Sequence, residues 1–181
     1  MPDEMVIRHC APTLASLKTG SLFVCAYEAM QDMHASIRSL NKRLGSKGLR
    51  VIPLRCQDGR CMVYVYRPDK LEKDLSNAAA EKILRDCGYE KMTGTDCVRR
   101  LMERLDCNGE FNHEIGLFLG YQPEDVEGFI CRKEAKCVGC WKVYGDVDQA
   151  RRKFAQYHKC TDAYLRLHAN GRGIERLTVA V

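Results

Sequence analysis

The hydrophobic residues of this chain recur with two periods, one typical of helices and one typical of strands. Within residues 30–44 they return every three or four positions, which predicts an amphipathic helix that ends at Gly45. The stretch just before it, residues 21–27, reads SLFVCAY and predicts a buried strand. Helical and extended patterns therefore follow each other closely in the first quarter of the chain.

Two β-branched-rich stretches, residues 49–56 and 61–67, flank the sequence Gln57-Asp58-Gly59-Arg60. Asp-Gly between such stretches is a strong signal for a β-hairpin. The hairpin sets Cys56 opposite Cys61. A disulfide between them is geometrically conceivable, and half of a zinc site is the alternative.

The rest of the chain is mainly helical by its pattern. Residues 69–106 form a charge-rich helical subregion of three pieces. Asp146 caps a long helix, and Gly171 follows the end of that helix. Alternation of Leu177, Val179 and Val181 predicts a closing strand over residues 174–181. The fold class predicted is α/β, as a single domain over residues 1–181. It has a mixed sheet of about five strands flanked by helices and a helical insertion in the middle.

The composition mainly excludes certain classes of protein and partner. The chain has 181 residues, of which 45% are hydrophobic and 29% charged, with a net charge of +5. No apolar stretch approaches the ~20 residues of a membrane helix, and the acidic start is unlike a secretory signal. The basic residues are scattered among acids, so neither nucleic acid nor membrane is an expected partner.

Cysteine is the one outlier, with eleven residues. The odd count and the expected lack of a signal peptide favour a cytoplasmic protein in a reducing compartment, with free or metal-bound thiols. This compartment argues against a disulfide between Cys56 and Cys61. For any single cysteine, a small buried hydrophobic role is the simpler interpretation.

Chemically active residues are densest in residues 112–146. We expect Asn112 to cap a short helix that ends at Gly120, and Pro123 to open a second. A polar loop and a strand over residues 141–144 follow. The groups that can take part in chemistry here are His113, Glu114, Cys131, Cys137, Cys140, Lys142 and Tyr144.

A second cluster lies near the start of the chain. His9 and Cys10 stand just before Pro12, which predicts a loop or strand end from which both side chains reach one site. The following turn, Lys18-Thr19-Gly20-Ser21, offers a cation, two hydroxyls and a flexible glycine, and suits an anion.

Longer motifs connect these clusters. They are His-Cys-Ala-Pro-Thr-Leu at 9–14, Leu-Lys-Thr-Gly-Ser at 17–21, Val-Tyr-Arg at 65–67, His-Glu-Ile-Gly-Leu-Phe-Leu-Gly-Tyr at 113–121, Glu-Asp-Val at 124–126, Gly-Phe-Ile at 128–130, Cys-Val-Gly-Cys-Trp-Lys-Val-Tyr-Gly-Asp at 137–146 and Tyr-His-Lys-Cys at 157–160. Together they resemble the family called domain of unknown function 3793, over nearly the whole chain. The resemblance implies that Cys10, Cys137 and Cys160 are motif cysteines, whereas Cys140 stands where tyrosine is common. It implies no activity.

Motif thiols from distant parts of the chain favour a cysteine-ligated metal protein. The more specific form of this hypothesis is an iron–sulfur redox enzyme with a small-molecule substrate and a redox partner protein. Zinc or an iron–sulfur cluster is the expected cofactor, because thiolates select both. The predicted ligands are Cys10, Cys137, Cys140 and Cys160, and the predicted acid–base groups are His9, His113 and Glu114. The site is expected where residues 9–21 meet residues 112–121, 137–144 and the helix of Cys160.

Two other functions stay open. The first is a non-catalytic module that binds a small anionic molecule through Lys18, Thr19, Ser21, Lys142 and Tyr144. The second is a metal-free thiol enzyme that uses Cys10 beside His9, or Cys137 together with Cys140. A purely structural role of the motifs is the remaining interpretation.

Overall fold

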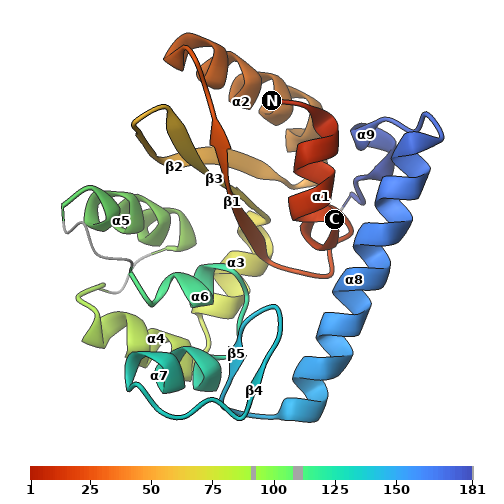
Figure 1. Ribbon diagram of the computed structural model, residues 1–181. Helices are drawn as coiled ribbons and strands as arrows, with labels where there is room; N and C mark the ends of the chain where they lie inside the picture. The colour runs from red at the N-terminus through yellow and green to blue at the C-terminus, as the bar shows by residue number, and fades with distance from the viewer. Residues whose placement is uncertain (91–92, 108–111, 181) are drawn as a thin grey trace. The chain divides into compact units, whose positions relative to one another are not determined.

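The computed structural model describes residues 1–90, 93–107 and 112–180 (Figure 1). It confirms an α/β chain and divides it into two compact units, Met1–Asp69 with Lys159–Val181, and Lys70–His158. The single domain over residues 1–181 stays a prediction. No helix of the described residues is long and apolar enough to cross a membrane.

The first unit is built on a three-stranded antiparallel sheet. Its strands are β1 (Gly20–Ala26), β2 (Arg50–Gln57) and β3 (Arg60–Tyr66), in the order β1-β3-β2. Asp58 and Gly59 both have positive φ, 52° and 71°, as the tight turn of a hairpin requires. The predicted first strand and the predicted hairpin are therefore confirmed.

Two helices, α1 (Asp3–Leu14) and α2 (Met30–Leu44), cover one face of this sheet (Figure 1). The structure confirms the predicted helix over residues 30–44, and a 3-10 turn, Gly45–Lys47, follows it. The core between helices and sheet includes Val6, Ile7, Cys10, Phe23, Ile37, Leu40, Val51 and Val63. The closing helix α9 (Ile174–Leu177) adds its two buried side chains to the same core.

A buried arginine connects the ends of several segments of the first unit. The Arg67 side chain is 2% exposed, and its guanidinium donates hydrogen bonds to the carbonyls of Thr13, Leu14, Lys47 and Val179 at 2.8–3.1 Å. Burial lowers the pKa of Arg67. Its fork of donors satisfies carbonyls at the end of α1, after α2 and near the C-terminus.

The second unit is mainly helical. It contains most of α3 (Pro68–Leu75), α4 (Ala78–Asp86), α5 (Gly94–Cys107), α6 (Ile115–Phe118), α7 (Pro123–Ile130), the short strands β4 (Cys137–Val138) and β5 (Lys142–Val143), and the start of α8 (Val147–Ala169). Asp146 caps α8 as predicted, because its Oδ1 accepts a hydrogen bond from Gln149 N at 2.9 Å. Gly171, with φ of 83°, follows the end of α8.

The predicted five-stranded mixed sheet is wrong. The described residues form a three-stranded and a two-stranded sheet, both antiparallel. Of the predicted strand over residues 174–181, residues 174–177 form helix α9, residues 178–180 belong to no strand, and residue 181 lies outside the described residues. Ile174 and Leu177 are three residues apart and both buried, so the helical spacing decides this segment, and not the alternation of residues 177–181.

The predicted loop at His9 and Cys10 is also wrong, because both lie within α1. Pro12 is in the last turn of this helix. The N–H that proline lacks therefore removes one backbone hydrogen bond close to the end of the helix. The helical pattern is present in the sequence, since Val6, Ile7, Cys10, Ala11 and Leu14 follow each other at spacings of three and four and are all buried.

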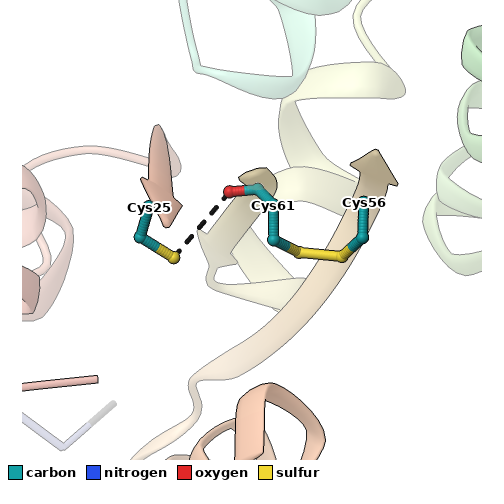
Figure 2. The surroundings of a disulfide bond; sticks show 3 residues. All are labelled: Cys25, Cys56 and Cys61. Atoms are coloured by element: carbon teal, nitrogen blue, oxygen red, sulfur yellow. Dashed lines mark hydrogen bonds between the residues drawn. A yellow bond between two sulfur atoms is a disulfide. The ribbon is translucent and has the colours of Figure 1, made fainter. Parts of the chain in front are cut away.

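The argument against a disulfide in the hairpin is overturned as well. Cys56 and Cys61 are joined by a disulfide, with their Cα atoms 4.0 Å apart (Figure 2). The hairpin register pairs these two residues directly, so the crosslink follows from the position of the Asp58-Gly59 turn. The geometry of the two strands brings Cys56 and Cys61 together, whereas the predicted reducing compartment gives no information on their distance.

Candidate functional site

The densest group of chemically active side chains lies in the second unit, around α6, α7 and the β4–β5 hairpin. The helix ends that the sequence predicts here are confirmed. Gly120 has a φ of 76° after α6, and Pro123 is the first residue of α7. One detail differs: Glu114, not Asn112, stands at the N-cap of α6.

Asp125 fixes the β4–β5 hairpin to α7. Its side chain lies in the first turn of α7 and is buried, at 5% exposure. One carboxylate oxygen accepts a hydrogen bond from Trp141 Nε1 at 2.7 Å, and the other accepts from the backbone N of Tyr144 at 2.7 Å and of Gly145 at 2.9 Å. The positive end of the helix dipole stabilises a carboxylate here. Asp125 therefore orients the hairpin residues that follow.

Aromatic rings pack around Trp141. Tyr121 stacks on it with ring centroids 4.7 Å apart, and Phe154 of α8 meets it edge-on at 4.5 Å. Tyr157 lies one turn further along α8, at 6.4 Å. Burial raises the pKa of Tyr121 and of Tyr157 to about 12, with a further contribution from the nearby Cys140. Both phenols thus stay neutral at physiological pH.

A cavity of about 270 Å³ opens beside this cluster. Its wall is mostly apolar, with a few polar groups, and consists of His113, Ile115, Gly116, Leu119, Tyr121, Asp125, Val126, Phe129, Cys140, Trp141 and Lys142. Two of the polar groups lie close to the Phe129 ring. Lys142 Nζ is 5.4 Å from its centroid, and the His113 ring meets it edge-on at 5.0 Å. A largely apolar wall with a few placed polar groups is typical of a small-molecule site.

A thiol and an imidazole meet at the edge of this cavity. Cys140 Sγ is 3.9 Å from Nε2 of His158, which comes from α8. Both side chains are exposed to solvent. A histidine beside a cysteine is the arrangement that can take a proton from a nucleophilic thiol.

Of the predicted site residues, the structure brings His113, Cys140 and Lys142 together in the cavity wall. Tyr144 is close by, but its ring packs directly over Gly128, where an added Cβ would lie 2.4 Å from Tyr144 Cγ. Glu114 is 3% exposed, and its carboxylate accepts hydrogen bonds from Arg104 Nε at 3.0 Å and Tyr89 OH at 3.2 Å. These contacts are those of a partly buried ion pair within the second unit.

Three of the predicted residues near the start of the chain, Cys10, Thr19 and Ser21, are buried in the first unit. Cys10 is fully buried, hydrogen-bonded to Ser21 and close to Lys18. The Ser21 and Thr13 hydroxyls are 2.8 Å apart. Burial raises the pKa of the Cys10 thiol to about 12, so it holds its proton at neutral pH.

Two of the predicted residues of this region, His9 and Thr19, have packing and backbone contacts. The exposed ring of His9 stacks on Phe23, with centroids 5.1 Å apart. Thr19 is buried, and its carbonyl accepts a hydrogen bond from the Arg67 backbone N at 2.9 Å. Both contacts lie within the first unit.

The predicted metal ligands are distributed over both units. Cys137 and Cys140 belong to the second unit, and Cys10 and Cys160 to the first. Burial raises the pKa of Cys160 to about 11. Across residues 1–90, 93–107 and 112–180, no group of three or more His, Cys, Asp or Glu side chains is arranged to hold a metal ion. The gathering of these thiols around one metal stays a prediction.

Sequence reasoning missed several contributors to the site, among them Tyr121, Asp125, Phe129 and His158. All four lie in the motifs that connect the clusters, so their positions carried a signal. Their roles depend on contacts between α7, the hairpin and α8, which no local pattern contains.

Comparison with known proteins gives a family and nothing further. The sequence model of one family, described as "Protein of unknown function (DUF3793)", matches residues 6–178. No curated protein and no solved structure matches the chain.

Proposed function

The chain belongs to the DUF3793 family, whose description names no activity, and from the cavity itself we propose that it binds a small planar molecule carrying an anionic group. The observation that carries this proposal is the cavity of about 270 Å³ with aromatic rings and a lysine in its wall. Ligand pockets usually measure roughly 300–1,000 Å³, so the expected ligand is small, with one or two rings.

Different residues of the cavity wall would bind the planar part and the anionic group of the ligand. Tyr121, Phe129 and Trp141 offer flat apolar surface for an aromatic or similarly planar body. The Lys142 ammonium, near the Phe129 ring, supplies the positive charge for a carboxylate or phosphate. His113, which meets the same ring edge-on, adds a further polar group.

The test uses an anionic and a neutral probe of the same shape. Saturation-transfer NMR with 2-naphthoate and with 2-naphthalenemethanol measures the dissociation constant of each. We expect Lys142→Gln to weaken naphthoate binding about tenfold, equivalent to the loss of one charged contact of about 1.4 kcal/mol, and to leave the alcohol unaffected. Phe129→Ala should weaken both.

Lys133→Gln is the matched control, because Lys133 is exposed in the turn after α7. The proposal fails if neither probe binds, or if Lys142→Gln and Lys133→Gln affect naphthoate equally.

A second candidate function is thiol chemistry in the same cavity, which the 3.9 Å contact between Cys140 Sγ and His158 Nε2 favours. Cys131 serves as the internal reference, because it is an exposed cysteine outside any disulfide. Iodoacetamide should modify Cys140 at least tenfold faster than Cys131, and His158→Gln should remove the difference. Equal rates of modification of Cys140 and Cys131 in the chain without substitutions would eliminate thiol chemistry as a candidate function.

The iron–sulfur or zinc hypothesis, with its redox partner protein, remains a third proposal, and it is based on the motif cysteines. Purification without oxygen, followed by iron, sulfide and zinc analysis, tests it directly. Stoichiometric metal that is lost in Cys10→Ser or Cys137→Ser would support it. A metal-free protein that still binds naphthoate would leave the cavity as the functional site.

A further inference from the structure

Three cysteines occupy one row across the sheet of the first unit (Figure 2). The strand register pairs Cys25 with Cys61 between β1 and β3, and Cys61 with Cys56 between β3 and β2. Paired residues of neighbouring strands point to the same face of a sheet. The three side chains are therefore side by side with Cys61 in the middle. Cys61 is bonded to Cys56, and Cys25 is a free thiol.

We propose that this row is a thiol–disulfide exchange site, in which Cys25 displaces Cys56 from Cys61. The Cys25 thiol gives its proton to solvent, and the thiolate electron pair forms a bond to Sγ of Cys61. The bond between Cys61 and Cys56 breaks, and Cys56 leaves as a thiolate that takes up a proton. No oxidant or reductant is consumed, and the crosslink moves from β2–β3 to β1–β3.

The backbone already holds Cys25 and Cys61 at a suitable separation. Tyr27 N donates to Gly59 O at 2.9 Å, and the register continues without a shift to Cys25 and Cys61, two residues further. In an antiparallel ladder this makes Cys25 and Cys61 a hydrogen-bonded pair, with Cα atoms about 5.5 Å apart. Disulfides most often span about 5.5–6 Å between Cα atoms. The Cys25 Sγ also lies 3.8 Å from the Cys61 carbonyl oxygen.

Strand order makes the exchange directional. The attacking, central and leaving sulfurs must lie roughly in line, and the order β1-β3-β2 arranges Cys25, Cys61 and Cys56 in that sequence. Cys56 is two strands from Cys25, roughly 10 Å away, so only Cys61 can be attacked. Cys56 is thus the thiol that is released, and it is the least buried of the three.

Solvent and small reagents have a route to both ends of the row. Cys25 is in the wall of a cavity of about 170 Å³, with Met5, Tyr27 and Met33. Cys56 is half-buried near the tip of the hairpin. A low-molecular-weight disulfide, such as oxidised glutathione, is the class of substrate that fits. The Cys56 thiolate attacks one of its sulfurs, forms a mixed disulfide and releases one glutathione thiolate.

Tryptic peptides distinguish the two crosslinks, because Arg55 and Arg60 separate the cysteines. Cys25 falls in residues 19–38, Cys56 in residues 56–60 and Cys61 in residues 61–70. The full chain, oxidised in air so that no added disulfide caps Cys56, is trapped with N-ethylmaleimide at pH 7 and pH 9, digested without reduction and analysed by mass spectrometry. We expect peptide 19–38 linked to peptide 61–70, with the reagent on Cys56, and at least fivefold more of it at pH 9. A link between Cys56 and Cys61 alone at both pH values would overturn the proposal.

Cys25→Ser should abolish labelling of Cys56, whereas Cys97→Ser, which removes a buried thiol of the second unit, should not. Labelling of Cys56 in Cys25→Ser at the unmodified level would contradict the exchange. A Cys56→Ser chain should form the Cys25–Cys61 link on oxidation, and its failure to do so would contradict it as well. The crosslink test on Cys56→Ser and the peptide analysis of the chain without substitutions test the exchange even if Cys25→Ser does not fold.

Discussion

The Asp125 carboxylate and the Trp141 indole, sixteen residues apart, are joined by a buried hydrogen bond of 2.7 Å. This bond attaches the β4–β5 hairpin to α7 and sets the position of two walls of the cavity. Because Trp141 is the only tryptophan of the chain, its fluorescence reports directly on this attachment.

Asp125→Ala should lower the free energy of unfolding by about 2–4 kcal/mol, because three donors lose a charged acceptor. Urea unfolding followed by Trp141 fluorescence measures the change. Asp148→Ala is the matched control, since Asp148 lies exposed in the first turn of α8. If both variants unfold at the same urea concentration, Asp125 does not hold the hairpin.

Gly139→Ala should disturb the aromatic cluster although Gly139 is exposed. A Cβ there would lie 2.2 Å from Cε2 of Phe154, which packs edge-on against Trp141. We expect a loss of about 1–3 kcal/mol and an altered near-UV circular dichroism signal of Trp141. Gly45→Ala is the control, because its Cβ would meet only the mobile end of Arg50 at 3.3 Å. An unchanged Trp141 signal in Gly139→Ala would argue against this packing.

Arg67→Met should destabilise the first unit by about 3 kcal/mol or more. The four carbonyls that accept from the guanidinium would lose their donors, and methionine offers none. Far-UV circular dichroism during urea unfolding measures the effect. Arg8→Met should cost less than about 0.5 kcal/mol, because Arg8 forms an exposed ion pair with Glu4. Similar losses in the two variants would contradict the role assigned to Arg67.

Alkaline pH should destabilise the fold partly through Cys10. The pKa of its thiol is about 12 in the folded chain, against an ordinary value of 9.0. The folded state therefore binds more protons than the unfolded state, and stability that is full below about pH 9 is lost as the pH rises toward 12.

Cys10→Ser should make the decline of stability above pH 9 shallower, because serine does not titrate in this range. Urea midpoints at pH 7, 9, 10 and 11 give the slope for each chain. Cys131→Ser, which removes an exposed thiol, is the control and should keep the slope of the unmodified sequence. An identical slope in Cys10→Ser would indicate that Cys10 ionises normally in the folded state.

The sequence by itself determined those features that depend on neighbouring residues. The spacing within residues 30–44 defines α2, the Asp58-Gly59 turn defines the hairpin, and Gly120 and Pro123 mark the adjacent helix ends. Family membership was also readable, because the motifs are long. His113, Cys140 and Lys142 could be named as site residues because they fall in one short segment rich in reactive groups.

Only the tertiary structure decided which groups meet. Asp125 gained its role from the hairpin that packs on α7, and His158 from the contact of α8 with Cys140. The number of strands was misjudged because alternation over residues 174–181 also fits a helical turn with two buried residues. The row of Cys25, Cys61 and Cys56 depends on β3 lying between β1 and β2. Strand order is set by pairing between distant segments, and a local hydrophobic pattern does not contain it.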